Sequence, residues 1–431
     1  MPRKHEVTEL TLNNGASGLL IHVPDATTVR YDIHFWAGGD FVRNQAARQT
    51  AHVMEHMAFG PNKKFASMEA YDREFTKNGA YHNAFTSTLD MEYVADAALM
   101  EWDRILDFQT LAITEPVFTQ ASLDSEKGNV REELMGYASN HSRVLWQNIM
   151  RQANLKRLFD PEEMKTIDAV TLEGIKEHYR HTHTMNNMNF VFAGDLKSHS
   201  QEIVKKLEAW QLPKGKRLIF GRDKPEKAPL VCIPRKELPS ITFNLAFFIN
   251  RVVTPAERQA MSVVSHALTG TFYSRIFGVA RKRGICYGMG SRVESEMTGE
   301  SSWWFSGQVS PQNAPELFQL IIEELAKLRQ DGLTEEELKA AKDYRLGSFQ
   351  MGGDTVNAIA SWYAGTYFEE HRIDYVHDMP GIIAATTLPD ITKIVNEFLQ
   401  SDAWAFGGIG NVNKTTLQPQ YDAFADFLKK R

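Results

Sequence analysis

The segment His52-Val53-Met54-Glu55-His56 decides how this chain of 431 residues is interpreted. Apolar residues recur around it at helical spacing until Gly60-Pro61, which predicts a helix within residues 45–60. Histidines four positions apart lie one above the other on a helix, so both imidazoles can reach one metal ion beside Glu55. Two nitrogen ligands and a neighbouring carboxylate are the layout of a zinc hydrolase site. The alternative is a helix whose histidines form hydrogen bonds within the core.

A second helix, expected to begin near Thr119, offers a third ligand. Positions 123, 126, 130, 133 and 137 follow the spacing of a buried face, yet two of them are Glu126 and Glu133. Burying an unpaired carboxylate is costly, so a cation is expected to compensate both. Glu132 points away from this face, and we therefore assign the ligand to Glu133. The alternative is that the two glutamates pair with buried arginines.

The overall composition is that of a globular protein long enough for two or three domains, with 43% hydrophobic and 24% charged residues. A formal net charge of −6 argues against nucleic acid or an anionic membrane as partner. The N-terminus leads directly into a strand-like pattern, which indicates neither a secretory signal nor a transit peptide. The two cysteines, Cys232 and Cys286, have no metal or redox spacing. We expect a cytoplasmic location, without a membrane-spanning segment.

Alternating apolar and polar runs predict an α+β fold. Expected strands in the first half cover residues 7–12, 19–23, 31–36, 81–87, 92–96 and 189–193, and helices lie between them. Residues 211–228 form a basic stretch with glycine and proline, typical of a linker. We therefore predict a metal-binding domain over residues 1–210, the linker, and a second domain over 229–431.

The second half repeats the first. The helix beginning near Thr119 matches residues 334–338 onward at an offset of 215, and the motif helix matches residues around His266 at an offset of 210. The copy retains His56 as His266. The other site positions change as a group: His52 becomes Ser262, Glu55 becomes Ser265, Glu126 becomes Ala341 and Glu133 becomes Ser348. Flanking apolar and glycine positions persist, so the differences are concentrated on the proposed site. The fold is thus predicted to comprise two homologous domains, each a mostly antiparallel sheet packed against helices and related by internal duplication.

With these motifs together, the chain resembles the insulinase/pitrilysin family of zinc peptidases, the inverzincins, and specifically its half-length members. The resemblance covers both halves and includes the histidine motif, the glutamates seven apart, residues 83–87 and the Gly-Ile-Cys-Tyr segment ending at Tyr287. It implies one Zn²⁺ per chain, bound by His52, His56 and Glu133. It also implies that Glu55 is the general base and that Glu126 supports the metal site.

The resemblance further implies an edge strand that captures the substrate backbone, formed by Asn83, Ala84, Phe85, Thr86 and Ser87. An open edge strand promotes aggregation, so it should be sheltered within a closed chamber. Members of this family close two halves over the substrate, and a chain of 431 residues carries one such half. The partners expected are therefore a peptide and either an identical chain or a sister subunit.

One position departs from the family pattern. The family places an arginine seven residues before Tyr287, where this chain has Ala280, and Arg281 follows one position later. Tyr287 is expected to contact the substrate carbonyl, and Arg281 either replaces the missing arginine or is a solvated surface residue. If the contact is lost, a sister subunit supplies it, which favours a heterodimer.

Two other groups of residues are expected to be structural. His181 and His183 lack a third partner for a metal, and Trp303-Trp304-Phe305 and Phe247-Phe248 are interpreted as sheet packing. The predicted function is zinc-dependent endopeptidase activity on short or unfolded peptides. The alternatives are a non-catalytic partner subunit of a related peptidase or complex, and a hydrolase acting on a non-peptide amide.

Overall fold

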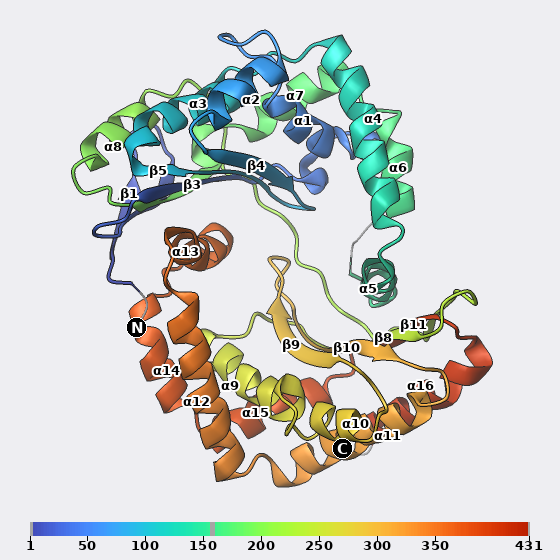
Figure 1. The fold of residues 1–431 in the computed structure, drawn as a ribbon. Coiled ribbons are helices and arrows are strands. Elements are labelled where there is room, and N and C mark those ends of the chain that lie inside the picture. Colours follow the sequence, from blue (N-terminus) through green and yellow to red (C-terminus); the bar gives the residue numbers. More distant parts are fainter. Residues whose placement is uncertain (1–2, 156–159, 430–431) are drawn as a thin grey trace. The chain divides into compact units, whose positions relative to one another are not determined.

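The computed structural model describes residues 3–155 and 160–429 (Figure 1), and the chain forms two compact units. The first unit comprises Met1–Gly136, Asp160–Phe220 and Phe349–Val376. The second comprises Tyr137–Phe159, Gly221–Ser348 and His377–Arg431. Each unit contains its own sheet and helical layers, so each is described separately.

The first unit is built on a six-stranded sheet in the order β1-β2-β6-β3-β5-β4. Neighbouring strands are antiparallel except β2 and β6, which are parallel. β6 is buried along its whole length, which requires cover on both faces of the sheet. The strands are β1 (Glu6–Thr11), β2 (Ser17–His22), β3 (Thr28–Phe35), β4 (Tyr81–Thr86), β5 (Met91–Ala98) and β6 (Met188–Gly194).

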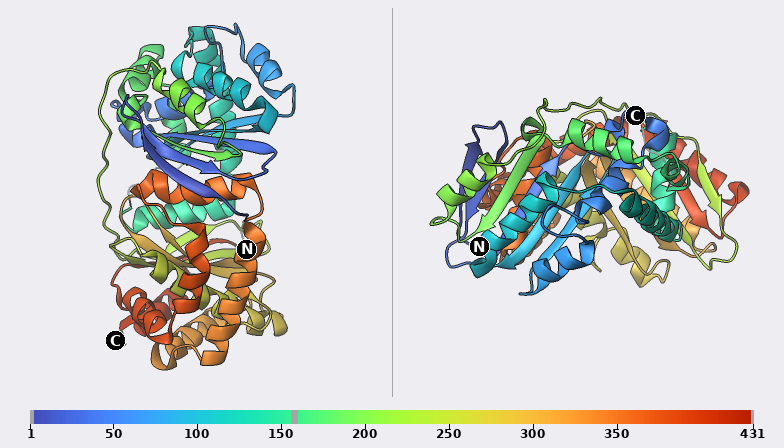
Figure 2. Two further views of the ribbon diagram at one scale, coloured as in Figure 1. Left: turned by 90° about the vertical axis from the view of Figure 1, so that its left-hand side faces the viewer. Right: turned by 90° about the horizontal axis from the view of Figure 1, so that it is seen from above.

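Helices cover the two faces of this sheet unequally. Most lie on one face, whereas α13 crosses the other, as Figures 1 and 2 show. α13 contacts β6 and β3, and its Tyr363 and Tyr367 are fully buried against apolar side chains of β2 and β6. The helices of this unit are α1 (Thr50–Ala58), α2 (Met68–Thr76), α3 (Trp102–Thr114), α4 (Gln120–Tyr137), α6 (Asp160–Ile167), α7 (Leu172–Thr182), α8 (Ser200–Glu208) and α13 (Val356–Glu370).

The second unit has a five-stranded sheet in the order β7-β11-β8-β10-β9. Only the β7–β11 pair is parallel. The strands are β7 (Val231–Pro234), β8 (Ile241–Ile249), β9 (Met289–Ser295), β10 (Ser301–Val309) and β11 (Trp404–Gly410). The helices are α5 (His141–Gln152), α9 (Pro255–Ser265), α10 (Phe277–Lys282), α11 (Ala314–Asp331), α12 (Glu335–Gly352), α14 (Met379–Ala385), α15 (Leu388–Gln400) and α16 (Lys414–Lys429).

The two sheets confirm the predicted α+β fold and its internal duplication. Strands β2, β6, β3, β5 and β4 occupy the same order as β7, β11, β8, β10 and β9, including the parallel pair. The two long helices agree as closely, because α4 and α12 each contain 18 residues and begin 215 positions apart. The duplication predicted from short sequence matches therefore extends to the topology.

The compact units are not the contiguous segments predicted from the sequence. The chain passes from the first unit to the second at Phe220 and Gly221, inside the predicted linker, but two helices belong to the opposite unit. α5 lies in the first half of the sequence and packs on β8 and β11 of the second unit. α13 lies in the second half and packs on the first sheet. Each helix buries its apolar face where a sheet face needs cover, and sequence periodicity does not specify which sheet that is.

Two further features bear on function. β4 lies at the end of the first sheet and pairs with β5 alone among the described strands. Over residues 3–155 and 160–429, no helix combines the length and the apolar character needed to span a bilayer.

Candidate active site

The motif helix α1 is fixed by its apolar side chains and presents the histidines on its remaining face. Val53, Met54 and Met57 are buried, and the helix packs against α7 and β4. His52 and His56 are only partly buried, and their ring centroids are 4.9 Å apart. The helix therefore holds two neighbouring imidazoles at the boundary of the core, as the four-residue spacing predicted.

The long helix α4 supplies the two glutamates. Its first turn is capped by Thr119, whose side-chain oxygen accepts a hydrogen bond from the backbone N–H of Ser122 at 3.1 Å. Leu123 and Val130 are buried on the face that also carries Glu126, whereas Glu132 is exposed. The choice of Glu133 over Glu132 agrees with this geometry.

Glu133 brings its carboxylate between the two imidazoles. Its Oε2 lies 3.4 Å from Nε2 of His52 and 3.3 Å from Nε2 of His56. Bonds of 2.0–2.1 Å in a tetrahedral zinc site place ligand atoms about 3.3 Å apart, so these separations fit that geometry. The side chains of His52, Glu55 and His56 also offer ligand atoms within 4.8 Å of one another. The donor set and its spacing fit a zinc ion held by His52, His56 and Glu133.

The electrostatic environment of His56 favours positive charge. Its Nδ1 lies 3.1 Å from Oε2 of Glu126, which also accepts a hydrogen bond from Asn129 at 2.9 Å. Burial by itself would lower the pKa of His56, but hydrogen bonds with Glu126 and Glu133 and the charges of Glu55 and Glu133 raise it to about 10. The hydrogen bond with His56 lowers the pKa of Glu126. These glutamates face imidazoles, in agreement with the predicted site.

Glu55 is buried beside the histidines and has a separate role in the geometry. Its Oε2 lies 3.9 Å from Nε2 of His52 and accepts a hydrogen bond from Thr86 of β4 at 3.4 Å. Burial raises the pKa of Glu55, and the charges of His56 and His52 oppose this shift. A carboxylate with a raised pKa next to an electrophilic site is suited to accept a proton.

Thr86 is the point at which the edge strand meets the site. β4 alternates as predicted, with Ala84 buried toward the helices and Phe85, 53% exposed, on the other face. Asn83 lies next to Ala84 in the strand, and Ser87 follows its end. The structure therefore places residues 83–86 on an edge strand that contacts the motif helix directly through the Thr86–Glu55 hydrogen bond.

Arg281 and Tyr287 lie together in the second unit. The Arg281 guanidinium stacks 4.1 Å from the ring centroid of Tyr287, and its NH1 donates to the backbone carbonyl of Tyr287 at 3.4 Å. The tyrosine is 83% exposed, whereas Ala280 is fully buried in α10. An arginine at position 280 would therefore be directed into the core, and position 281 presents the guanidinium beside the tyrosine.

The residues interpreted as structural are accommodated in the core. His183 is fully buried between Tyr93 and Thr182, with its Nε2 2.8 Å from the Tyr93 hydroxyl, and burial lowers its pKa to about 3. The aromatic side chains of residues 247–248 and 303–305 are buried on both faces of the second sheet. The interpretation of the aromatic residues as sheet packing is confirmed, whereas His181 is only partly buried.

Sequence analysis missed one contributor to the site. Gln49 is buried three residues before His52, and its Oε1 lies 3.0 Å from Nδ1 of His52. The signal was available, because residues three apart share a helix face. The partner that fixes Gln49, Glu163, comes from a helix more than a hundred residues later and has no such signal.

Comparisons with known proteins show the family to which this chain is similar. A model described as "Insulinase (Peptidase family M16)" matches residues 24–163, and "Peptidase M16 inactive domain" matches residues 169–344. The uncharacterized zinc protease YmxG of Bacillus subtilis is 23% identical over 82% of this chain and 86% of its own length. The β subunit of bovine mitochondrial-processing peptidase is 24% identical over 43% of this chain and 42% of its own length.

Solved structures show the same fold. A chain described as the peptidase M16 inactive domain from Pseudomonas fluorescens superimposes with a TM-score of 0.82 at 19% identity, covering 95% of this chain and 99% of the other. The periplasmic protease PqqL from Escherichia coli gives a TM-score of 0.81 at 17% identity. That match covers all of this chain but 51% of PqqL, so this chain has about half the length of that protein.

Proposed function

Because this chain belongs to the insulinase family of peptidases, we propose that it is a zinc-dependent endopeptidase acting on short or unfolded peptides. The observation that carries this proposal is the convergence of His52, His56 and Glu133 at separations suited to one tetrahedral zinc ion. When bound, zinc lowers the pKa of a coordinated water and polarises a carbonyl group. We expect one ion per chain.

Glu55 is the proposed general base. Its buried carboxylate lies on the same helix face as the two imidazoles, and burial raises its pKa, which favours proton transfer near neutral pH. It accepts the proton of the attacking water and returns it to the leaving amine. Glu126 holds Nδ1 of His56 and so directs Nε2 of that ring toward the ligand position.

The proposed substrate is an extended peptide that pairs with β4. Main-chain hydrogen bonds to an edge strand are indifferent to substrate sequence, and pockets for alternate side chains add preference. The Thr86–Glu55 hydrogen bond joins the end of this strand to the proposed base. A peptide paired along residues 83–86 would therefore pass beside the carboxylate that accepts the proton.

The proposal includes a paired assembly in which a closed chamber shelters β4. One relative is named as a subunit of mitochondrial-processing peptidase, which supports an assembly of more than one chain. A homodimer and a heterodimer with a sister chain both satisfy this requirement. We propose that Tyr287, with Arg281 stacked on its ring, contacts the substrate carbonyl from the second unit of one of the paired chains.

The test is digestion of a mixture of unfolded peptides by the purified protein, before and after treatment with a chelator and after zinc is restored. Mass spectrometry of the fragments should show internal cleavage that disappears on chelation and returns with zinc. Cleavage that resists chelation would contradict a metal-dependent peptidase. Zinc binding without cleavage by the chain alone, followed by cleavage when a sister chain is added, would support the heterodimer. If that mixture still cleaved when this chain carried Glu55→Gln, the alternative of a non-catalytic partner subunit would hold.

A further inference from the structure

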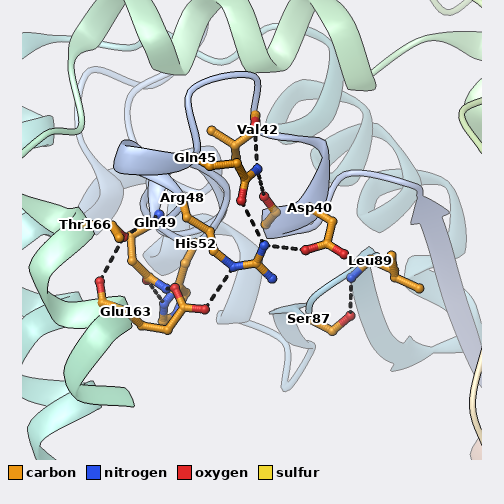
Figure 3. A network of polar contacts seen from close by, with 11 residues as sticks. Asp40, Val42, Gln45, Arg48, Gln49, His52, Ser87, Leu89, Glu163 and Thr166 are labelled. Carbon is orange, nitrogen blue, oxygen red and sulfur yellow. Dashed lines mark hydrogen bonds and ion pairs between the residues drawn. The ribbon is translucent and has the colours of Figure 1, made fainter. Parts of the chain in front are cut away.

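We propose that Gln49 and Glu163 are positioning residues that fix the imidazole of His52 in the orientation and tautomer needed for metal binding. This inference rests on the zinc site proposed above. It assigns a role to a hydrogen-bond network that joins Gln49 and His52 to α6 (Figure 3). Neither residue reaches the ligand atoms, so each acts through His52.

The network begins at the ring nitrogen of His52 that does not face Glu133. Nδ1 of His52 lies 3.0 Å from Oε1 of Gln49, and Nε2 of Gln49 donates to Oε2 of Glu163 at 2.7 Å. Figure 3 shows Gln49 between the imidazole and the carboxylate. Gln49 is 8% exposed, so these bonds are largely shielded from competing water.

Glu163 determines which end of the Gln49 amide faces His52. An ionised carboxylate only accepts hydrogen bonds, so it selects the NH₂ group of the amide. The opposite orientation would place the amide oxygen against the carboxylate oxygen at the present 2.7 Å separation. The amide oxygen must therefore face the imidazole. An oxygen acceptor in turn requires the proton of His52 on Nδ1, which leaves the lone pair of Nε2 directed toward Glu133.

The other carboxylate oxygen of Glu163 also accepts a hydrogen bond. Nε of Arg48 donates to Oε1 of Glu163 at 3.0 Å, and the same guanidinium contacts Asp40 and Gln45. The backbone N–H of Gln49 donates to Thr166 of α6 at 3.1 Å. Both carboxylate oxygens are thus engaged by groups with defined positions, and the carboxylate is a fixed acceptor for the amide.

The two proposed metal-ligating histidines are therefore oriented by different hydrogen-bond acceptors. Nδ1 of His56 faces the Glu126 carboxylate directly, whereas Nδ1 of His52 faces a neutral amide that a carboxylate has aligned. Both acceptors are oxygen atoms, so both select the tautomer that carries the proton on Nδ1. The network also reaches the turn after the edge strand, because the backbone N–H of Asp40 donates to the carbonyl of Thr88 at 2.9 Å.

The first experiment measures zinc affinity by competition with a chromogenic chelator. Gln49→Met has similar volume and lacks the amide, and we expect it to weaken zinc binding by about 10- to 100-fold. Gln120→Met is the matched control, because Gln120 donates to the Asp124 carboxylate at 2.8 Å in an exposed pair that does not include a histidine. The control should bind zinc as the unmodified protein does, and thermal melting of the metal-free proteins should show that both variants fold.

The second experiment exchanges the amide and the carboxylate. Gln49→Glu places its new carboxylate against the carboxylate of Glu163. Glu163→Gln removes the carboxylate that fixes which end of the Gln49 amide faces His52. Each single variant should therefore weaken zinc binding. In the double variant, the new carboxylate at position 49 accepts from Nδ1 of His52 and the new amide at position 163 donates to that carboxylate, so we expect zinc affinity to be restored. A role confined to packing α6 against α1 would not predict this recovery.

The third measurement uses the unmodified protein, so it does not depend on whether a variant folds. Two-bond ¹H–¹⁵N spectra of the zinc-loaded protein should show the His52 ring protonated at Nδ1 and metal-bound through Nε2. Coordination through Nδ1, unchanged affinity in Gln49→Met, or a double variant as weak as its parents would each overturn the inference. Failure of the unmodified protein to bind zinc would instead overturn the proposed function on which the inference rests.

Discussion

His56 and His266 occupy equivalent positions in the two units, yet their environments shift their pKa values in opposite directions. His56 faces Glu126 and Glu133, which raise its pKa to about 10 against the effect of burial. His266 stacks on Tyr344 at a centroid distance of 4.1 Å, and burial together with the charge of Arg345 lowers its pKa. The same residue type, at positions matched by the sequence repeat, thus lies in an environment that favours a cation in one unit and a neutral ring in the other.

The difference arises from side chains while the backbone is retained. α4 and α12 have the same length, but Glu126 and Glu133 of α4 correspond to Ala341 and Ser348 of α12. Ala341 is fully buried, as expected for an apolar residue on a core-facing helix. The duplicated fold therefore does not need the carboxylates, which indicates that their presence in α4 serves the site rather than stability.

The largest expected effect comes from Glu55→Gln, which removes the proposed base while preserving side-chain size. Turnover of a cleavable peptide should fall by about 10²- to 10⁴-fold because general-base catalysis is lost. Zinc content and thermal stability should remain near those of the unmodified protein. Peptide cleavage at an undiminished rate would show that the distinction between Glu55 and its counterpart Ser265 is not catalytic.

Glu133→Ser introduces the residue found at the equivalent position of the second unit. Because the substitution removes a proposed metal ligand, zinc affinity should fall by more than the roughly 10- to 100-fold typical of supporting residues. Metal analysis after dialysis measures the loss, and Glu132→Ser is the control because Glu132 is exposed on the same helix. Full zinc occupancy in Glu133→Ser would disprove the ligand assignment.

Glu126→Ala introduces the counterpart residue Ala341 and tests support for His56 rather than direct binding. Zinc affinity should fall by about 10- to 100-fold, since Nδ1 of His56 loses its carboxylate acceptor. Competition with a chelator measures the change. Equally tight zinc binding before and after this substitution would show that Glu126 does not support His56. The difference between Glu126 and Ala341 would then not explain the difference between the two halves.

His266→Ala is expected to have the smallest effect on the site. It removes the stacking contact with Tyr344 in the second unit, and the free energy of unfolding should fall by about 1–2 kcal/mol. Zinc stoichiometry and affinity should not change, because all residues of the proposed metal site lie within the first unit. Zinc titration measures the number of ions bound per chain. A lower number for His266→Ala would show that zinc binding in the first unit depends on the second unit.

Several parts of the fold and site follow from local sequence patterns. The strands of the first unit lie within a few residues of the predicted ranges, because they are short apolar-rich runs between turn residues. The expectation of one exposed face per strand was wrong for β2, β3 and β6, whose residues are buried on both faces because helices cover both sides of the sheet. The ligand geometry also follows from spacing: residues four apart on α1 and seven apart on α4 must share helix faces. The buried stripe of α4 was predictable for the same reason, including its two anomalous glutamates.

Other features required the folded chain. The exchange of α5 and α13 between the units depends on which sheet face the other helices leave uncovered. The amphipathic pattern of a helix does not specify the sheet on which the helix packs. The orientation of Gln49 depends on Glu163, which approaches from α6. The position of Arg281 over Tyr287 likewise required the direction of α10, which buries Ala280.

The sequence by itself predicted which residues could bind a metal ion, and it showed that the other half of the duplication has different residues at most of those positions. This was possible because ligand spacing within a helix is a property of local backbone geometry. The tertiary structure alone decided how α1, α4, α6 and β4 meet around those residues. Their hydrogen bonds join positions far apart in the chain, and only packing brings such positions together.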